Sequence, residues 1–503
     1  MFDYFLNGIV ASFSPVTFLT MLMGVVGGIV IGCLPGMTGS MGLVLMMPLL
    51  YYLQPSDALL TLAGIMCGSM YGGSISAILI STPGTPSAAA TMLDGYPLTR
   101  QGKAGKALGI AVVSSAAGGI FSSLALLLIA PALAEVAMSF HAHEYFSLSI
   151  FGLTIMAGAS GKNLVKGLAA GWTGLFLSTV GVDGNMGLSR FTFDIPNLMG
   201  GINILPVLIG VFALSQIFEN GEAIQKPHEI IDQDLRDVWP TFADMKRIAL
   251  SLAIGCVVGT FIGIIPGTGG AIACFLSYDL ARKLHRNGDK FGTGLIEGIA
   301  APESSNNATT GGALVPMLTL GIPGDVMTAV MLGALMLIGV RPGPLLFTEQ
   351  PEAVYTLLAG MFVIQFVILA IGMGACRVSP LLLRVPPALL NPAIVVFSVV
   401  GSYTLGNNLF DVWLTFFFGI AGYFMRKFDF PGAPMVLGLI LGPMAEDHLN
   451  RALLVSRNDW STFVTRPISG FFIGLSVLSI AFSFLAYGKG KSKSASGGGK
   501  SAA

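Results

Sequence analysis

The sequence has very few charged residues. Lys, Arg, Asp and Glu make up only 10% of its 503 positions, whereas a soluble domain carries about 25%. Apolar residues make up 53% of the chain, and the mean hydropathy is +0.78. This composition excludes an ordinary soluble domain and predicts an all-α polytopic membrane protein. The formal net charge is zero, so no basic excess points to a nucleic-acid partner.

Sequence motifs for enzymatic chemistry are also missing. The five cysteines lie singly in apolar runs, at spacings that fit no metal motif, and we interpret them as small buried hydrophobes. The chain contains no P-loop, GxSxG or HExxH motif. We therefore expect neither enzymatic activity nor ATP binding. The first residues lack the basic region of a signal peptide, so we expect the first apolar segment to be retained.

Apolar runs of spanning or near-spanning length recur along the chain, and they predict about 11–13 transmembrane segments. The most polar internal stretch lies between Glu219 and Arg247. We predict four regions: a first transmembrane repeat at 1–220, a polar cytoplasmic linker at 221–247, a second, inverted transmembrane repeat at 248–487, and a disordered basic tail at 488–503.

The two halves share landmarks in the same order. Pro35 and Pro266 lie 231 residues apart, Gly72 and Gly311 lie 239 apart, and Pro83 and Pro323 lie 240 apart. Basic residues gather in loop 94–106 of the first half and in loop 281–293 of the second half, and these loops are not equivalent. Because short cytoplasmic loops are enriched in Lys and Arg, equivalent loops are expected on opposite sides. This pattern is typical of an inverted-topology repeat.

Proline and glycine predict four interruptions in the apolar helices, at 34–40, 81–86, 265–270 and 321–325. Lipid penalises broken backbone, so we expect these breaks to be buried or to line a polar cavity. The new helix N-termini attract anions, and the freed carbonyls can coordinate sodium. The breaks therefore predict a site for a carboxylate and a sodium ion, held by interrupted or re-entrant helices.

Two sets of residues follow from these breaks. The predicted substrate-binding residues are Ser81, Thr82, Gly84, Thr85, Asn306, Asn307, Gly321, Pro323 and Gly324. The predicted sodium ligands are Gly36, Thr38, Gly39, Gly267, Thr268, Gly269 and Asp325.

Three acids have two interpretations each. Asp325 is expected either beside sodium or as a helix cap. Glu303 lies in the polar stretch 302–312 and is interpreted as a cation ligand or as an interfacial residue. Asp94 is interpreted as part of a turn at the membrane edge rather than as a functional residue.

Several long motifs resemble one family. They are Gly32-Cys-Leu-Pro-Gly-Met-Thr-Gly39, Tyr71-Gly-Gly-Ser-Ile-Ser-Ala-Ile-Leu-Ile-Ser-Thr-Pro-Gly-Thr-Pro86, Pro302-Glu-Ser-Ser-Asn-Asn-Ala308 and Gly311-Gly-Ala-Leu-Val-Pro-Met-Leu-Thr-Leu-Gly-Ile-Pro-Gly-Asp325. Through them, the chain from about residue 15 to 487 resembles the large membrane subunit of tripartite tricarboxylate transporters.

The resemblance implies a permease subunit in the bacterial inner membrane. It implies two partners, a small four-helix membrane subunit and a periplasmic substrate-binding protein. The expected function is uptake of di- or tricarboxylates such as citrate, driven by a sodium or proton gradient. An elevator-like architecture follows only by analogy. A passive carboxylate channel is the alternative, and whether the chain forms a homo-oligomer stays open.

Overall fold

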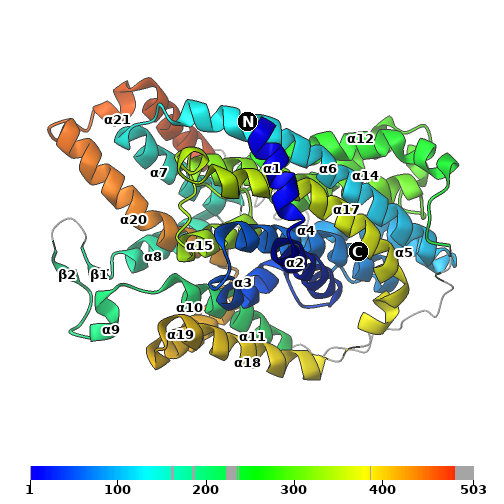
Figure 1. The fold of residues 1–503 in the computed structure, drawn as a ribbon, viewed down its shortest axis with the longest axis horizontal. Coiled ribbons are helices and arrows are strands. Elements are labelled where there is room, and N and C mark those ends of the chain that lie inside the picture. Colours follow the sequence, from blue (N-terminus) through cyan, green and yellow to red (C-terminus); the bar gives the residue numbers. More distant parts are fainter. Residues whose placement is uncertain are drawn as a thin grey trace, which may run out of the picture.

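The computed structural model describes residues 2–159, 164–183, 187–222, 235, 237–383, 385 and 387–481. Helices dominate these residues (Figure 1). Within the described ranges, the only strands are β1 (Gly181–Val182) and β2 (Ser189–Arg190), which pair as a short antiparallel hairpin. The prediction of an all-α polytopic membrane protein is confirmed. The predicted tail at 488–503 and about half of the predicted linker, residues 223–234 and 236, lie outside the described residues.

The inner bundle is formed by residues 15–137 and 242–382. The first half contributes α2 (Pro15–Cys33), α3 (Gly39–Leu50), α4 (Pro55–Ile80), η1 (Pro86–Ala88), α5 (Ala89–Arg100) and α6 (Ala104–Ala137). The second half contributes α12 (Phe242–Ile264), α13 (Gly269–Leu284), η3 (Gly288–Lys290), α14 (Ile296–Leu320), α15 (Val326–Leu337), α16 (Leu346–Glu349) and α17 (Pro351–Leu382). The N-terminal helix α1 (Phe2–Ser12) packs against α17.

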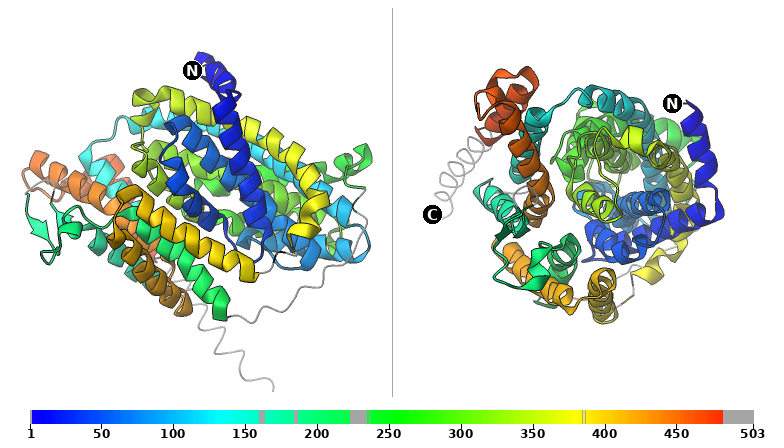
Figure 2. Two further views of the ribbon diagram at one scale, coloured as in Figure 1. Left: turned by 60° about the horizontal axis from the view of Figure 1, so that its bottom comes forward. Right: turned by 60° about the vertical axis from the view of Figure 1, so that its left-hand side comes forward.

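The outer bundle is formed by residues 142–222 and 387–481. Its first part contains α7 (Ala142–Ala159), α8 (Leu164–Ser178), α9 (Pro196–Met199), α10 (Ile204–Leu208), the π-helical η2 (Ile209–Leu214) and α11 (Ser215–Glu222). Its second part contains α18 (Pro387–Gly406), α19 (Leu409–Lys427), α20 (Gly432–Val455), α21 (Thr462–Thr465) and an apolar helix over Pro467–Ala481. The right-hand view of Figure 2 shows this bundle curving along one side of the inner bundle.

Helices α4 and α14 occupy the centre of the inner bundle, and nearly all of their side chains are buried. Small residues allow neighbouring helices to approach them closely. A Cβ atom on Gly24, Gly28 or Gly32 of α2 would lie within 2.5 Å of a backbone oxygen of α4. In the second half, three glycines of α12 contact the α14 backbone in the same way: Gly255, Gly259 and Gly263. The two halves therefore pack their first and third membrane helices alike.

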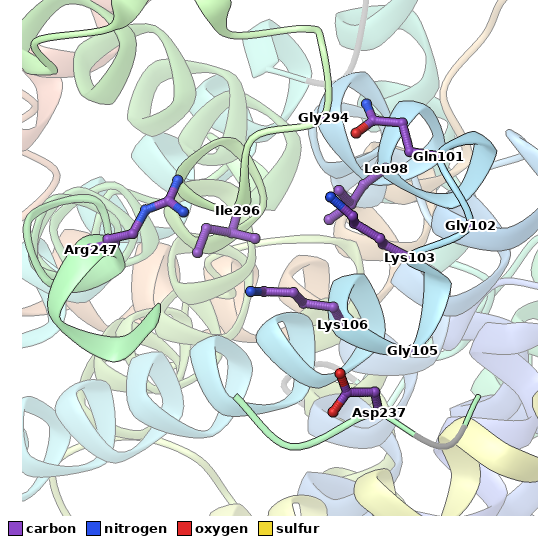
Figure 3. Close-up of a pocket in the computed structure, with 10 residues that line it drawn as sticks. All are labelled: Leu98, Gln101, Gly102, Lys103, Gly105, Lys106, Asp237, Arg247, Gly294 and Ile296. Carbon is purple, nitrogen blue, oxygen red and sulfur yellow. The ribbon is translucent and has the colours of Figure 1, made fainter. Parts of the chain in front are cut away.

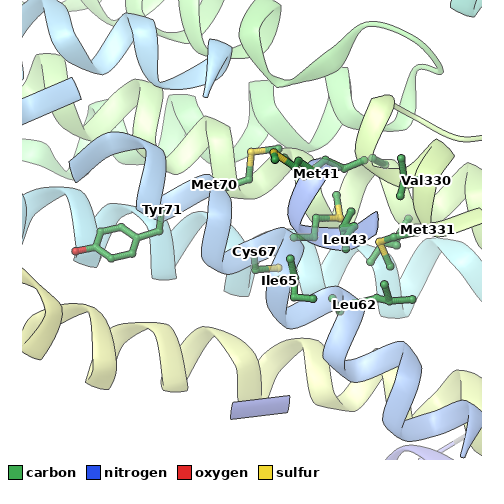
Figure 4. Close-up of a cluster of buried hydrophobic side chains, with 14 of the residues drawn as sticks. Met41, Leu43, Leu62, Ile65, Cys67, Met70, Tyr71, Val330 and Met331 are labelled. Carbon is green, nitrogen blue, oxygen red and sulfur yellow. The ribbon is translucent and has the colours of Figure 1, made fainter. Parts of the chain in front are cut away.

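Apolar side chains fill the space between α3, α4 and α15, as Figure 4 shows. Met41, Ile65 and Met331 are at most 1% exposed there. Tyr71 points away from this cluster, toward α17, where its hydroxyl donates to the carbonyl oxygen of Gly372 at 3.3 Å. Burial of this kind holds the two halves of the chain together, because α15 belongs to the second half and α3 and α4 to the first.

Seven helices in the described ranges are long and apolar enough to cross a membrane, and five shorter apolar helices accompany them. The predicted total of 11–13 segments stays a prediction. The expected loop over 94–106 is wrong except at residues 101–103, because α5 continues to Arg100 and α6 begins at Ala104. Asp94 accordingly lies inside a helix and is 0% exposed, so its interpretation as a turn residue is also wrong. Its carboxylate accepts hydrogen bonds from Tyr278 and from the backbone of the loop before α14, which local sequence could not reveal.

Candidate functional site

The four predicted helix breaks are confirmed. They separate α2 from α3, α4 from η1, α12 from α13, and α14 from α15. Each break ends at an N-cap residue that begins the next helix: Thr38, Thr85, Thr268 and Asp325. The short helix η1 runs directly into α5, so this N-terminus also belongs to a longer helical segment.

These four N-termini converge on one cavity of about 480 Å³. Each break contributes its N-cap residue and the two residues that follow, as Thr38, Gly39 and Ser40 do for α3. Unpaired N–H groups and the helix dipole make a helix N-terminus attractive to anions. A cavity lined by four of them favours an anionic ligand, and its size lies within the ordinary range for small-molecule sites.

The outer bundle supplies most of the remaining cavity wall. Phe212 comes from the π-helical η2, Arg426 from the end of α19, and residues 431–433 from the start of α20. π-helical segments within α-helices frequently occur at functional sites. The cavity therefore lies between the two bundles rather than inside one of them.

Arg426 is the basic residue in the cavity wall. Its Nη1 donates to Gln216 Oε1 at 2.6 Å and to Glu219 Oε2 at 3.1 Å, and its Nε donates to Ser215 Oγ at 3.2 Å. Among the described residues, no hydrogen bond uses Nη2. The guanidinium is thus held in place by the outer bundle and keeps two N–H donors for a ligand, a geometry suited to carboxylates.

Asp325 is the acid in the cavity wall. Its Oδ1 accepts from the backbone N–H of Thr328 at 2.8 Å and from the Thr328 hydroxyl at 2.7 Å, and the hydroxyl accepts from the backbone N–H of Asp325. This reciprocal pattern caps α15, so the capping interpretation is confirmed. The sodium interpretation stays a prediction.

Residues from the predicted sodium site and from the predicted substrate site line the same cavity in the structure. Seven of the predicted residues line the same cavity: Thr38, Gly39, Thr85, Gly267, Thr268, Gly269 and Asp325. Gly36 lies just outside, where its carbonyl oxygen accepts from Asn220 Nδ2 at 3.1 Å. Both sets therefore surround one space, and only Thr85 of the predicted substrate set contacts it directly.

Other predicted substrate residues form the opposite ends of the breaks. Ser81 and Gly321 adopt left-handed backbone conformations, with φ of 56° and 69°, and end α4 and α14 as C-caps. Thr82, Pro323 and Gly324 follow these caps and do not line the cavity. A Cβ atom on Gly84 would lie 2.0 Å from the carbonyl oxygen of Gly32. These residues give the breaks their shape, and their predicted contact with substrate stays a prediction.

Asn306 and Asn307 lie in the middle of α14 and are fully buried. Asn306 Nδ2 donates to the carbonyl oxygen of Met70 at 3.1 Å. Within the described part of the chain, Asn306 Oδ1 and both amide atoms of Asn307 have no hydrogen-bond partner. Unpaired buried amides are costly, so the two asparagines remain candidates for a function, although they lie behind the cavity wall.

Sequence reasoning missed the contribution of the outer bundle. Arg426 and Lys427 follow an apolar run, a pattern that indicates a membrane boundary. Nothing in the local sequence distinguishes the two residues, yet Arg426 reaches the cavity while Lys427 pairs with Glu222 at the surface, 3.0 Å away. Only the packing of the helices in the tertiary structure distinguishes Arg426 from Lys427.

A second cavity of about 340 Å³ lies where α5, α6, α12 and α14 meet (Figure 3). Lys103, Lys106 and Arg247 gather around it. Lys106 Nζ lies 2.6 Å from Asp244 Oδ1, and Arg247 makes a two-bond contact with Glu297. Because two of its three cations are already paired, this cavity is a weaker anion site than the one between the bundles.

Broken helices around a cavity within a helical membrane protein are typical of secondary transporters. Comparison with protein families matches residues 18–437 to the family described as "Tripartite tricarboxylate transporter TctA family". The chain therefore belongs to the TctA family, the large subunit of tripartite tricarboxylate transporters. It is a multi-pass membrane component of a transporter and not an enzyme.

Two relatives come from Agrobacterium vitis. The first, described as an uncharacterized 52.8 kDa protein in the TAR-I ttuC' 3' region, is 35% identical over 478 residues, which cover 95% of both chains. The second, an uncharacterized protein in the TAR-II ttuC' 3' region, is 38% identical over 227 residues, which cover 45% of this chain and 94% of the relative. No solved structure matches the chain.

Proposed function

We propose that this protein is the permease subunit of a secondary active transporter that imports organic di- and tricarboxylates, such as citrate, into bacteria across the inner membrane. The observation that carries this proposal is the convergence of four helix N-termini on one cavity of about 480 Å³. Membership of the TctA family supports the same substrate class.

Two carboxylate groups of one solute can be recognised in different ways in this cavity. The N–H groups of α3 and α13 face it from the inner bundle, and Arg426 faces it from the outer bundle. A solute with two or more carboxylates can contact both walls at once, whereas a monocarboxylate can contact only one. We therefore expect preference for di- and tricarboxylates over acetate.

Sodium is the coupling ion that this site supports best. Asp325 places a carboxylate in the wall of a cavity proposed for anions, and a cation between the two would remove the repulsion. The hydroxyls and carbonyls of the breaks, such as Thr38 and the segment 265–268, provide oxygen ligands of the kind that coordinate sodium in broken-helix transporters. Sodium would thereby complete the solute site.

The position of the cavity between two bundles also supports alternating access. The inner bundle carries all four breaks, and the outer bundle carries Arg426. Movement of the inner bundle past the outer bundle would expose the cavity first to one side and then to the other, as in an elevator. The matched glycine contacts of α2 with α4 and of α12 with α14 support the proposed inverted repeat.

The proposed partners are a small four-helix membrane subunit and a periplasmic binding protein that delivers the solute. The test is uptake by proteoliposomes containing the three components, with a panel of organic acids and with or without a sodium gradient. We expect uphill accumulation of di- or tricarboxylates that collapses when the sodium gradient is removed. Uptake that only equilibrates the solute would instead indicate a passive channel.

Arg426→Gln tests the site itself. A hydrogen bond to a charged group is worth about 1.5–3 kcal/mol, so we expect the half-saturating concentration to rise about 10- to 100-fold. Lys427→Gln is the matched control, because it removes a neighbouring cation that contacts Glu222 at the surface rather than the cavity. Equal uptake by wild type and Arg426→Gln would remove Arg426 from the site.

A further inference from the structure

Glu303 is an acidic residue buried in the middle of the inner bundle. It lies on α14 and is 0% exposed. Its Oε1 accepts from the Thr91 hydroxyl of α5, and its Oε2 accepts from the Ser115 hydroxyl of α6 at 3.0 Å. No Lys, Arg or His in the described ranges pairs with it. A buried carboxylate without a cation is expensive, so the group requires either a proton or a metal ion.

A third hydroxyl lies beside the same carboxyl. Ser74 of α4 also lies within hydrogen-bonding reach of the Glu303 carboxyl. Its single hydroxyl proton is directed at the carbonyl oxygen of Tyr71, 2.5 Å away. The Thr91, Ser115 and Ser74 hydroxyls are all neutral, so they supply no positive charge to balance an ionised carboxylate. Among the described residues, no group of three or more His, Cys, Asp or Glu side chains could hold a metal ion, so the surroundings of Glu303 favour a proton over a metal ion.

The titratable neighbours of Glu303 do not supply a positive charge. Tyr71 of α4 and Cys274 of α13 are the titratable groups that interact with it most directly. Asp94 of α5 lies one turn from Thr91, and its carboxylate is occupied by Tyr278 and by backbone N–H groups. Two cations of the other packed helices are engaged elsewhere: Lys106 of α6 pairs with Asp244, and Arg247 of α12 pairs with Glu297.

Glu303 lies one helical turn behind the wall of the solute cavity. Three elements each place one residue in the cavity wall and, four residues later, another residue beside Glu303. The pairs are Met70 and Ser74 of α4, Ser87 and Thr91 of η1 and α5, and Gly270 and Cys274 of α13. Four residues of helix rise about 6 Å. In each of the three elements, therefore, about one helical turn separates the cavity wall from the carboxyl.

Asn306 occupies the space between the cavity wall and Glu303 on α14. It follows Glu303 by three residues and therefore lies on the same helix face. A Cβ atom on Gly270 of the cavity wall would lie 3.4 Å from Asn306 Oδ1, an acceptor without a hydrogen-bond partner among the described residues. This unpaired oxygen is a hydrogen-bond acceptor on the path that a proton would take between the cavity and the buried carboxyl.

We propose that Glu303 is a proton-binding site whose protonation is coupled to solute transport. Transport would carry one proton on the Glu303 carboxyl in addition to sodium near the cavity. The proton binds while the cavity faces the outside and leaves toward the inside. When the Glu303 carboxyl is protonated, the inner bundle can move across the membrane without an unpaired buried charge. This inference rests on the proposed carboxylate uptake.

The test uses the complete three-component system in proteoliposomes. The external pH is held constant, so that the solute keeps one protonation state, and the internal pH is raised. We expect the wild type to accumulate solute faster as the inside becomes more alkaline and to alkalinise the external medium during uptake. Glu303→Gln, which mimics the neutral acid, is expected to keep solute exchange at equal pH and to lose the pH-driven component at least tenfold.

Controls separate this inference from the proposed function. Glu352→Gln makes the same change at an exposed acid of α17 and should leave the pH-driven component intact. Sodium-driven uptake by the wild type without any pH-driven component would overturn the role of Glu303 and leave carboxylate transport standing. Absence of uptake under every gradient would overturn both.

A second measurement does not depend on the Gln variant being stable. Thr91→Val removes one hydrogen bond to Glu303 and Thr91→Ser keeps it, so the pH-driven component should fall in the first and persist in the second. Infrared difference spectra of the wild type, recorded as pH is raised, should lose a protonated-carboxyl band. A band that is absent at every pH would show that Glu303 stays ionised and would refute the proposal.

Discussion

Gly84→Ala tests whether the break between α4 and η1 is held in place by α2. A Cβ atom at position 84 would lie 2.0 Å from the carbonyl oxygen of Gly32, whereas ordinary contacts begin at 3.4 Å. The backbone on one side or the other must therefore move by more than 1 Å. Neither contacting atom belongs to a flexible side chain, so the strain cannot be relieved by a rotamer change.

The expected cost follows from known effects of overpacking. Forcing an extra methyl group into a packed interior costs about 1–3 kcal/mol, and the reduced freedom of the unfolded chain offsets about 0.4–1 kcal/mol of it. We expect a net loss of about 1–2 kcal/mol in unfolding free energy. Thr85 follows directly and lines the cavity, so the half-saturating concentration for uptake should rise about tenfold, which corresponds to about 1.4 kcal/mol.

Thermal unfolding in detergent and uptake in proteoliposomes measure these two effects. Gly27→Ala is the control, because a Cβ atom there meets nothing within 4 Å. Gly324→Ala makes the equivalent change in the second half, where the nearest atom would be the Ala313 Cβ at 2.6 Å, and should also destabilise. If Gly84→Ala matched Gly27→Ala in both assays, contact with α2 would not determine the geometry of the break.

Two further predictions concern stability and reactivity. Asp94→Ala should lower the unfolding free energy by about 3 kcal/mol, because buried backbone donors at Gly292, Gly294 and Leu295 lose their acceptor. Asp94→Asn, which keeps one oxygen acceptor, should lose less, and equal melting temperatures for both variants would contradict this role. The five cysteines are all buried as free thiols, so a membrane-impermeant maleimide should label them only after denaturation. Rapid labelling of the folded protein would show that one of them is exposed.

The helix breaks illustrate how much local sequence can establish. Proline and glycine act on their own backbone and on the preceding turn, so the breaks near Pro35, Pro83, Pro266 and Pro323 could be located without tertiary information. These inferences succeed because the responsible forces act within a few residues.

The polar stretch 302–312 shows the limit of the same reasoning. Its Ser and Asn residues favour caps and loops, yet the whole stretch is helical and buried. The hydroxyls around Glu303 come from α4, α5 and α6. Partners so distant in sequence leave no local pattern, so the choice between a cation ligand and an interfacial residue could not be made from the stretch alone.

The sequence by itself determined the class of protein, because apolar composition sets the membrane environment and because proline and glycine set the positions of the breaks. It also provided the family motifs. Only the tertiary structure decided which end of each break faces the cavity. Every break has one end with free N–H groups and one with free carbonyls, and packing of α3, α5, α13 and α15 brings the N–H ends together. Arg426 joins them from the outer bundle, since a contact between distant helices depends on their packing and not on neighbouring residues.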